Sequence, residues 1–93
     1  MKYCEIDKSD CEFVAKFCNC NLVMVKKLYN DNFEPYMLEM VLENSNRERF
    51  ICKLYEDKKL ITSISKYLNR ALETLIERAL DKIEQQRAVQ TYL

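Results

Sequence analysis

Hydrophobic and polar residues divide the chain into segments that follow different periods. From Cys11 to Tyr29, apolar residues recur every three or four positions, which is the spacing of one face of a helix. The pattern weakens over residues 20–25, where Val23 and Met24 add apolar bulk off that face. We therefore predict a helix that continues to about Tyr29 and is followed by a turn at the polar cluster Asn30-Asp31-Asn32. A break near residues 19–21, or a strand over residues 22–29, is the alternative.

The start of this helix is predicted at Ser9. Ser9 and Glu12 have the spacing of a capping box, in which each side chain bonds the backbone N–H of the other residue. Residues 1–8 follow no clear period, so they form either a short strand or a disordered lead.

Two segments alternate between apolar and polar residues, which is typical of half-buried strands, and a third is short and rich in β-branched residues, which also favours a strand. The first runs over residues 36–43 after Pro35, the second over residues 50–54, and the third over residues 60–64. A polar loop over residues 43–48 and a charged turn over residues 56–59 separate them. Connections this short indicate an antiparallel meander.

A long amphipathic helix is predicted to end the chain, with Ser65 as its N-cap. Its apolar stripe consists of Leu68, Leu72, Leu75, Ile76, Ala79, Leu80 and Ile83. The stripe fades after Ile83, so we expect residues 84–93 to project as a polar helical tail.

The predicted order is therefore α-β-β-β-α. A three-stranded antiparallel sheet with two helices packed on one face forms a two-layer α+β domain. With 93 residues, one domain over residues 1–93 is expected, in which residues 1–8 and 84–93 are peripheral.

Composition argues against an enzyme. The chain has no glycine, which excludes glycine-rich phosphate loops, and no histidine, which excludes Ser-His-Asp and Cys-His catalysis. We expect no catalytic residue, no metal and no cofactor. Fifteen basic residues balance fifteen acidic ones, so bulk charge gives no attraction to nucleic acid.

The five cysteines, Cys4, Cys11, Cys18, Cys20 and Cys52, fit a disulfide framework poorly because their number is odd. The N-terminus has no apolar leader, and no segment is long enough to cross a bilayer. We expect a cytoplasmic protein with reduced thiols. A zinc site or a redox role is possible in principle, but buried thiols that act as small apolar residues are favoured.

Charge is uneven along the chain. Residues 1–45 hold five basic and eight acidic residues, and residues 46–93 hold ten basic and seven acidic ones. The basic positions nearest the first hairpin loop and the start of the last helix are the candidates for contacting nucleic acid. These are Arg47, Arg49, Lys58, Lys59, Lys66 and Arg70.

Residues 22–80 resemble a double-stranded RNA-binding domain. Pro35-Tyr36 and Phe50 stand where that family opens its first two strands, and Ser65-Lys66 with Arg70 matches the start of its last helix. The resemblance implies the same α-β-β-β-α fold and contacts with duplex RNA.

The RNA-contacting motifs of that family are missing. Residues 44–47 read Asn-Ser-Asn-Arg where the family carries Gly-Pro-x-His, and Tyr67 replaces a lysine. Degenerate members of that family look like protein-interaction modules. We therefore expect a non-catalytic module that dimerises or docks on a larger protein, through a sheet edge or helix surface at Leu60, Ile61, Ile64 and Tyr67.

Two alternatives remain open at this stage. One is binding of double-stranded RNA or DNA through the basic positions named above, and the other is a small viral or phage-type inhibitor of a host protein. Neither a membrane nor a small-molecule substrate is expected as a partner.

Overall fold

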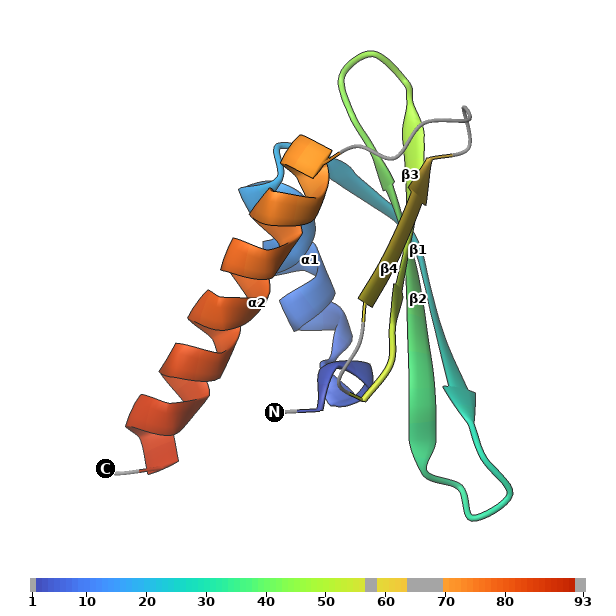
Figure 1. Cartoon of the computed structure of the whole chain (residues 1–93), viewed down its shortest axis with the longest axis vertical. Helices are drawn as coiled ribbons and strands as arrows, with labels where there is room; N and C mark the ends of the chain where they lie inside the picture. Colours follow the sequence, from blue (N-terminus) through green and yellow to red (C-terminus); the bar gives the residue numbers. More distant parts are fainter. Residues whose placement is uncertain (1, 57–58, 64–69, 92–93) are drawn as a thin grey trace.

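The computed structural model describes residues 2–56, 59–63 and 70–91. A 3-10 helix (η1, Tyr3–Glu5) and a first α-helix (α1, Lys8–Phe17) precede the sheet, and a long helix (α2, Arg70–Thr91) follows it. The strands are β1 (Asn21–Tyr29), β2 (Pro35–Glu43), β3 (Arg49–Leu54) and β4 (Lys59–Ser63). Both α-helices lie on the same face of the antiparallel sheet (Figure 1). The predicted α+β class, with two helices on one face, is confirmed.

The sheet is a meander in which each strand pairs antiparallel with the next, in the order β1-β2-β3-β4. Strands β2, β3 and β4 are the three predicted strands, each within one residue of its expected bounds. β1 is a fourth strand, which the predicted order lacked. It forms one edge of the sheet, and β4 forms the other.

The favoured helix over residues 18–29 was wrong, and the alternative strand is correct. Helix α1 ends in a Schellman motif, the hydrogen-bonded turn that commonly closes helices. The Cys20 N–H donates to the Ala15 carbonyl at 2.8 Å, and the Asn19 N–H donates to the Lys16 carbonyl at 3.0 Å. Asn19 has φ 55°, a conformation in which the helix cannot continue.

A β-bulge explains why the pattern in β1 resembled a helix. Leu22 pairs with Leu42 and Met24 pairs with Val41, so Val23 is an extra residue in the strand. The bulge puts Leu22 and Val25, which are three positions apart, on the same face of the sheet. A spacing of three is also the spacing of a helix face.

The capping box of α1 lies two residues before its predicted position. Asp7, not Ser9, is the N-cap, and the Asp10 N–H donates to Asp7 Oδ1 at 2.8 Å. The Asp7 N–H in turn donates to Asp10 Oδ2 at 3.2 Å. A carboxylate accepts from backbone N–H groups as well as a hydroxyl does, so the earlier Asp pair starts the helix.

The N-terminal lead packs against the sheet. Residues Tyr3–Glu5 form η1 instead of the strand or the disordered segment that the sequence left open. Cys4 and Ile6 are fully buried, and the Tyr3 N–H donates to the Glu56 carbonyl at 3.2 Å. The lead therefore closes one end of the core.

The core lies between the sheet and the two helices. The inner face of the sheet contributes Leu38, Met40, Leu42, Phe50, Cys52 and Leu54. Helix α2 contributes Leu72, Ile76, Ala79, Leu80 and Ile83, as its predicted stripe requires. Leu68 and the proposed N-cap Ser65 lie outside the described residues.

The predicted polar tail continues α2 as a helix to Thr91. It also contacts the rest of the molecule, because Arg87 Nη2 bonds Asp10 Oδ2 of the α1 capping box at 2.7 Å. Neither described α-helix combines the length and the apolar composition that crossing a bilayer requires.

Candidate functional site

Of the basic residues predicted to contact nucleic acid, Arg49 and Lys59 lie beside opposite ends of β3. Arg47 is exposed in the β2–β3 loop, and Arg49 beside it lies 3.8 Å from a Glu43 carboxylate oxygen. Lys59 pairs with Glu77 of α2. It is the first residue of β4 and is in register with Leu54, the last residue of β3. The ends of β3, Arg49 and Leu54, are five positions apart, which corresponds to a distance of roughly 16 Å. Arg70 is exposed at the beginning of α2, and Lys58 and Lys66 lie outside the described residues.

Of the four residues predicted to bind a protein partner, two lie in the described part of the chain. Leu60 and Ile61 belong to the edge strand β4, where Ile61 is in register with Cys52. Ile64 and Tyr67 lie outside the described residues. β4 forms one edge of the sheet, and the use of Leu60 and Ile61 in binding stays a prediction.

The cysteines are mostly core residues. Burial raises the pKa of Cys11, Cys18 and Cys52 to about 12, so these thiols stay protonated near neutral pH. Cys4 is also buried, and only Cys20, among the cysteines, is partly exposed. In the described part of the chain, no three Cys, His, Asp or Glu residues are grouped as a metal site would need. A protonated, buried thiol is a poor nucleophile and a poor metal ligand.

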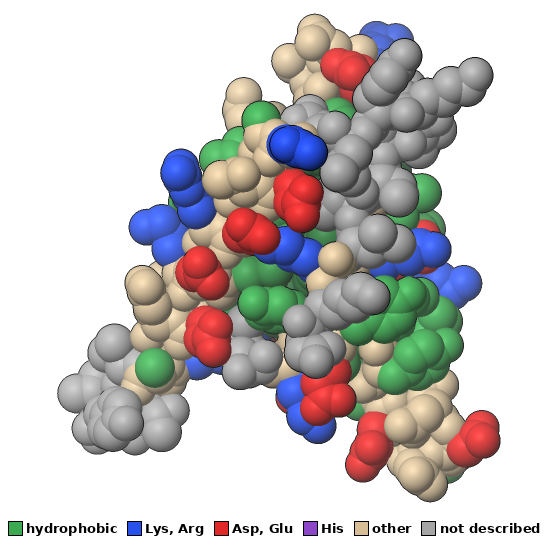
Figure 2. Space-filling model, viewed as in Figure 1, with side chains coloured by type: hydrophobic (Ala, Val, Ile, Leu, Met, Phe, Trp, Pro, Cys, Tyr) green, Lys and Arg blue, Asp and Glu red, His purple; other side chains and the backbone are tan. Residues whose placement is uncertain are grey.

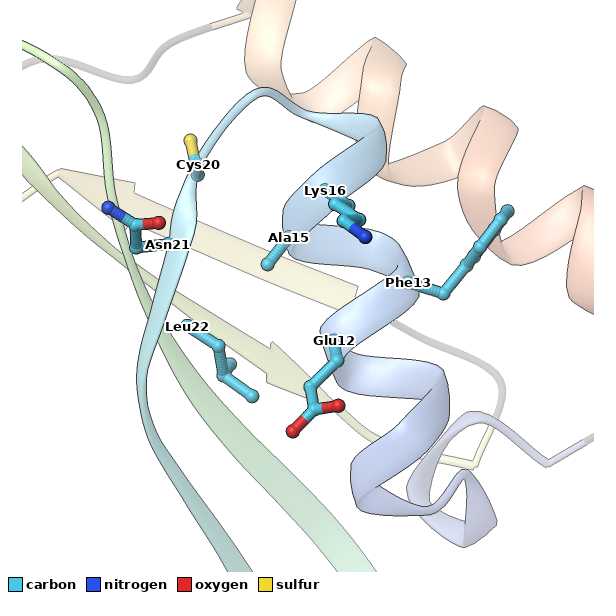
Figure 3. Close-up of a pocket in the computed structure, with 7 residues that line it drawn as sticks. All are labelled: Glu12, Phe13, Ala15, Lys16, Cys20, Asn21 and Leu22. Carbon is cyan, nitrogen blue, oxygen red and sulfur yellow. The ribbon is translucent and has the colours of Figure 1, made fainter.

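A shallow groove runs between α1 and the edge strand β1, with a volume of about 420 Å³. Figure 3 shows Ala15, Glu12 and Leu22 pointing into the space between helix and strand, and Phe13 pointing away toward α2. Lys16 and Glu12 give the groove both signs of charge. A bulge at Val23 and two lysines, Lys26 and Lys27, mark β1 as an edge that resists pairing with another strand.

The face of the sheet away from the helices is half apolar. The residues that alternate with the core positions point there, including Met24, Leu28, Met37, Val41 and Ile51. Lys26, Glu39 and Lys53 are in register across three strands and form a charged row through the middle of this face. Burying such a row costs free energy, so this face is suited to solvent. Self-association of the chain stays a prediction.

The two hairpin loops at opposite ends of β2 are built on the same frame. Residues 30–34 read Asn-Asp-Asn-Phe-Glu, and residues 44–48 read Asn-Ser-Asn-Arg-Glu. In the first loop, Asn30 Oδ1 accepts from the backbone N–H groups of Asn32 at 2.9 Å and Glu34 at 3.0 Å. In the second loop, Asn44 Oδ1 accepts from Asn46 and Glu48, both at 3.0 Å. The shared spacing is present in the sequence, but the sequence alone does not show that it forms this hydrogen-bonded frame.

The fourth residue of each loop takes a left-handed backbone conformation. Phe33 has φ 60° and Arg47 has φ 63°, and each N–H donates to the carbonyl of the first loop residue at 3.0 Å. Left-handed conformations are uncommon for residues other than glycine and are a genuine outlier for a bulky side chain. The hydrogen bonds of the frame therefore hold Phe33 in a strained position.

Phe33 is 88% exposed, the largest exposed fraction of the large hydrophobic residues in the described chain. Tyr29 (56% exposed) and Tyr36 (45% exposed) flank the same loop. We call these three residues the aromatic tip. Figure 1 shows this loop at the lower end of the sheet, far from the β2–β3 loop at the upper end. The sequence predicts the turn at residues 30–32 but not the exposure of the aromatic side chain that follows it.

Acidic residues surround the aromatic tip. Asp31 and Glu34 belong to the loop, and Glu5 and Glu56 line a recess of about 190 Å³ beside it. Lys2 lies in this recess and bonds Glu56 Oε1 at 3.2 Å. That hydrogen bond, with the charges of Glu56 and Glu5, raises the pKa of Lys2. Figure 2 shows acidic side chains at the lower right end of the molecule, with hydrophobic ones just above them.

Comparisons with known proteins add no name to this site. No family model matches the chain. No curated protein and no solved structure matches it either.

Proposed function

We propose that this chain is a non-catalytic protein-interaction module that docks on a larger protein through the aromatic tip. The observation that carries this proposal is Phe33, an aromatic side chain that is 88% exposed while its backbone is held at φ 60°. A residue that only closed a turn would be better replaced by glycine. Arg47 shares this backbone conformation, so the feature particular to Phe33 is an exposed aromatic ring on an ordered loop, and such rings dominate many protein interfaces.

The rest of the molecule supports a binding role. The thiols of Cys11, Cys18 and Cys52 are buried and stay protonated, so they supply no nucleophile near neutral pH. The basic residues Arg49 and Lys59 face carboxylates, which reduces the charge available for a phosphate backbone. The acidic surroundings of the tip also favour a protein over a nucleic acid, because phosphates are repelled there.

Affinity capture tests the proposal. Wild type, Phe33→Ala and Arg47→Ala are immobilised separately and exposed to an extract of the cells from which the gene comes. Arg47→Ala is the matched control, because Arg47 has the same position in the same loop frame. We expect at least one protein that wild type and Arg47→Ala retain and Phe33→Ala loses. An identical set of proteins on all three supports would contradict docking through the tip.

A further inference from the structure

Resting on the proposed docking role, we infer the chemistry of the partner: the aromatic tip inserts Phe33 into an apolar pocket that is rimmed by Lys and Arg side chains on a different protein. The inference rests on three features of the tip. They are the exposed ring, the fixed loop that carries it, and the sign of the charges around it.

The ring supplies the apolar contact. A phenylalanine side chain buries on the order of 200 Å² when it is fully enclosed, and such aromatic anchors dominate many protein interfaces. Tyr29 and Tyr36 extend the aromatic surface on the strands beside the loop. A pocket that accepts the Phe33 ring therefore meets further aromatic surface at its edge.

The loop supplies a fixed geometry. The Asn30 N–H donates to the Glu34 carbonyl at 2.9 Å, and Asn30 Oδ1 accepts two further backbone N–H groups. A side chain whose backbone is already ordered loses less conformational entropy on binding than one on a mobile loop. This feature favours insertion into a preformed pocket over adsorption to a flat surface.

The charges determine the rim of the pocket. Asp31, Glu34, Glu5 and Glu56 are four carboxylates at this end of the molecule, and Lys2, the cation among the described residues that line the recess, already bonds Glu56. Complementary interfaces place positive groups opposite such a surface, and this arrangement mainly gives specificity and speed of association. The same charges repel nucleic acid and anionic lipid.

A second copy of this chain does not fit the description. The groove between α1 and β1 carries Glu12 beside Lys16 and so offers no basic rim. The charged row of Lys26, Glu39 and Lys53 occupies the middle of its other open face. The partner is therefore a different protein.

Site-specific photocrosslinking tests this inference. Phe33 is replaced by p-benzoyl-phenylalanine in the full chain, expressed in its native cells, and the crosslinked residue is identified by mass spectrometry. The same replacement of Arg47, in the matching loop, is the control. We expect Phe33→p-benzoyl-phenylalanine to crosslink to one protein, inside an apolar pocket with Lys or Arg side chains at its rim. We expect the control to leave that protein unlabelled.

The charge is tested on the same background. Asp31→Ser with Glu34→Ser removes two carboxylates and leaves the backbone hydrogen bonds of the loop in place, since Ser45 already occupies the position equivalent to Asp31. We expect this pair of changes, or an increase in salt from 50 to 500 mM, to lower the crosslinking yield several-fold, roughly fivefold.

The possible outcomes separate this inference from the proposed function. A crosslink to a protein that is unaffected by salt and by the two serine changes, or that lies in an acidic pocket, would overturn the basic rim and leave docking through the tip intact. A crosslink to a second copy, nucleic acid or lipid, or no crosslink from position 33, would overturn both.

Discussion

Three residues in the described part of this glycine-free chain have positive φ angles: Asn19 at 55°, Phe33 at 60° and Arg47 at 63°. At Asn19 the residue type explains the conformation, because asparagine tolerates a positive φ angle and closes α1. Phe33 and Arg47 have no such reason in their own chemistry. Their conformations are imposed by Asn30 and Asn44, whose side chains bond the loop backbone from within.

Replacing Phe33 by glycine is expected to stabilise the fold by about 0.5–1 kcal/mol, because glycine reaches positive φ without the clash of a Cβ atom. The exposed ring makes little contact whose loss would offset this gain. The free energy of unfolding in urea is the measurement. Phe33→Ala retains a Cβ and should change it little, and Arg47→Gly should match Phe33→Gly. A Phe33→Gly variant less stable than wild type would show that the ring packs on the fold.

A sequence can predict a turn without indicating which side chains of the turn are exposed. The cluster Asn30–Asn32 predicted a turn correctly, yet the exposure of Phe33 depends on the positions of the strands and helices around it. An aromatic residue next to a turn is more often packed than exposed. The repeated Asn-x-Asn-x-Glu spacing was the one available signal, and it indicates a frame, not a function.

At the scale of elements, predictions succeeded where the period of the pattern was unambiguous. Alternation identified β2 and β3, a run of β-branched residues identified β4, and the apolar stripe that begins at Leu68 and ends at Ile83 identified α2. The prediction for β1 was wrong because a bulge at Val23 converts the period of two into a spacing of three. Over so short a stretch, the sequence cannot distinguish this spacing from that of a helix. Only pairing with β2 resolves that ambiguity.

The capping box of α1 predicts a specific acid response. Hydrogen bonding from the Asp10 backbone N–H lowers the pKa of Asp7 below its ordinary value of 3.8. A carboxylate whose pKa is depressed in the folded state stabilises the fold above its unfolded pKa, and this contribution is lost as the pH falls through the folded value. The midpoint of thermal unfolding should therefore fall as the pH drops below about 4.

Asp7→Asn isolates this response, because asparagine also caps a helix but does not titrate in this range. The variant should have a shallower decline of the unfolding midpoint below pH 4 than wild type has. Equal declines in the two proteins would mean that other carboxylates carry the acid sensitivity. Glu12→Gln, an exposed position on the same helix, is the control.

At the scale of the whole molecule, the core includes the N-terminal lead, both helices and the inner face of the sheet. Four of the five cysteines, including Cys4 in the lead and Cys52 in β3, are buried within it. Their distribution makes thiol reactivity a measure of how well the whole core is closed. Partly exposed Cys20, whose Sγ donates to the Cys18 carbonyl at 3.3 Å, is the exception.

A colorimetric thiol reagent should therefore modify one thiol per native chain readily, and all five after denaturation. Cys20→Ser should remove the fast reaction and leave the total lower by one. The time course of absorbance at neutral pH is the measurement. Fast modification of two or more thiols in the native protein would mean that the lead or α1 opens often enough to admit the reagent.

The repeated loop frame means that side chains can be exchanged between the two ends of β2 without loss of the backbone hydrogen bonds. Because the hydrogen bonds involve the first asparagine, the backbone and, in the second loop, the Glu48 carboxylate, the side chains at the second and fourth positions take no part in the frame. Exchanging Asp31 with Ser45 and Phe33 with Arg47 would move the aromatic ring to the opposite pole of the molecule. The exchange would separate the Phe33 ring from the features that stay behind at the original end, which are Tyr29, Tyr36 and the carboxylates of Glu5 and Glu56.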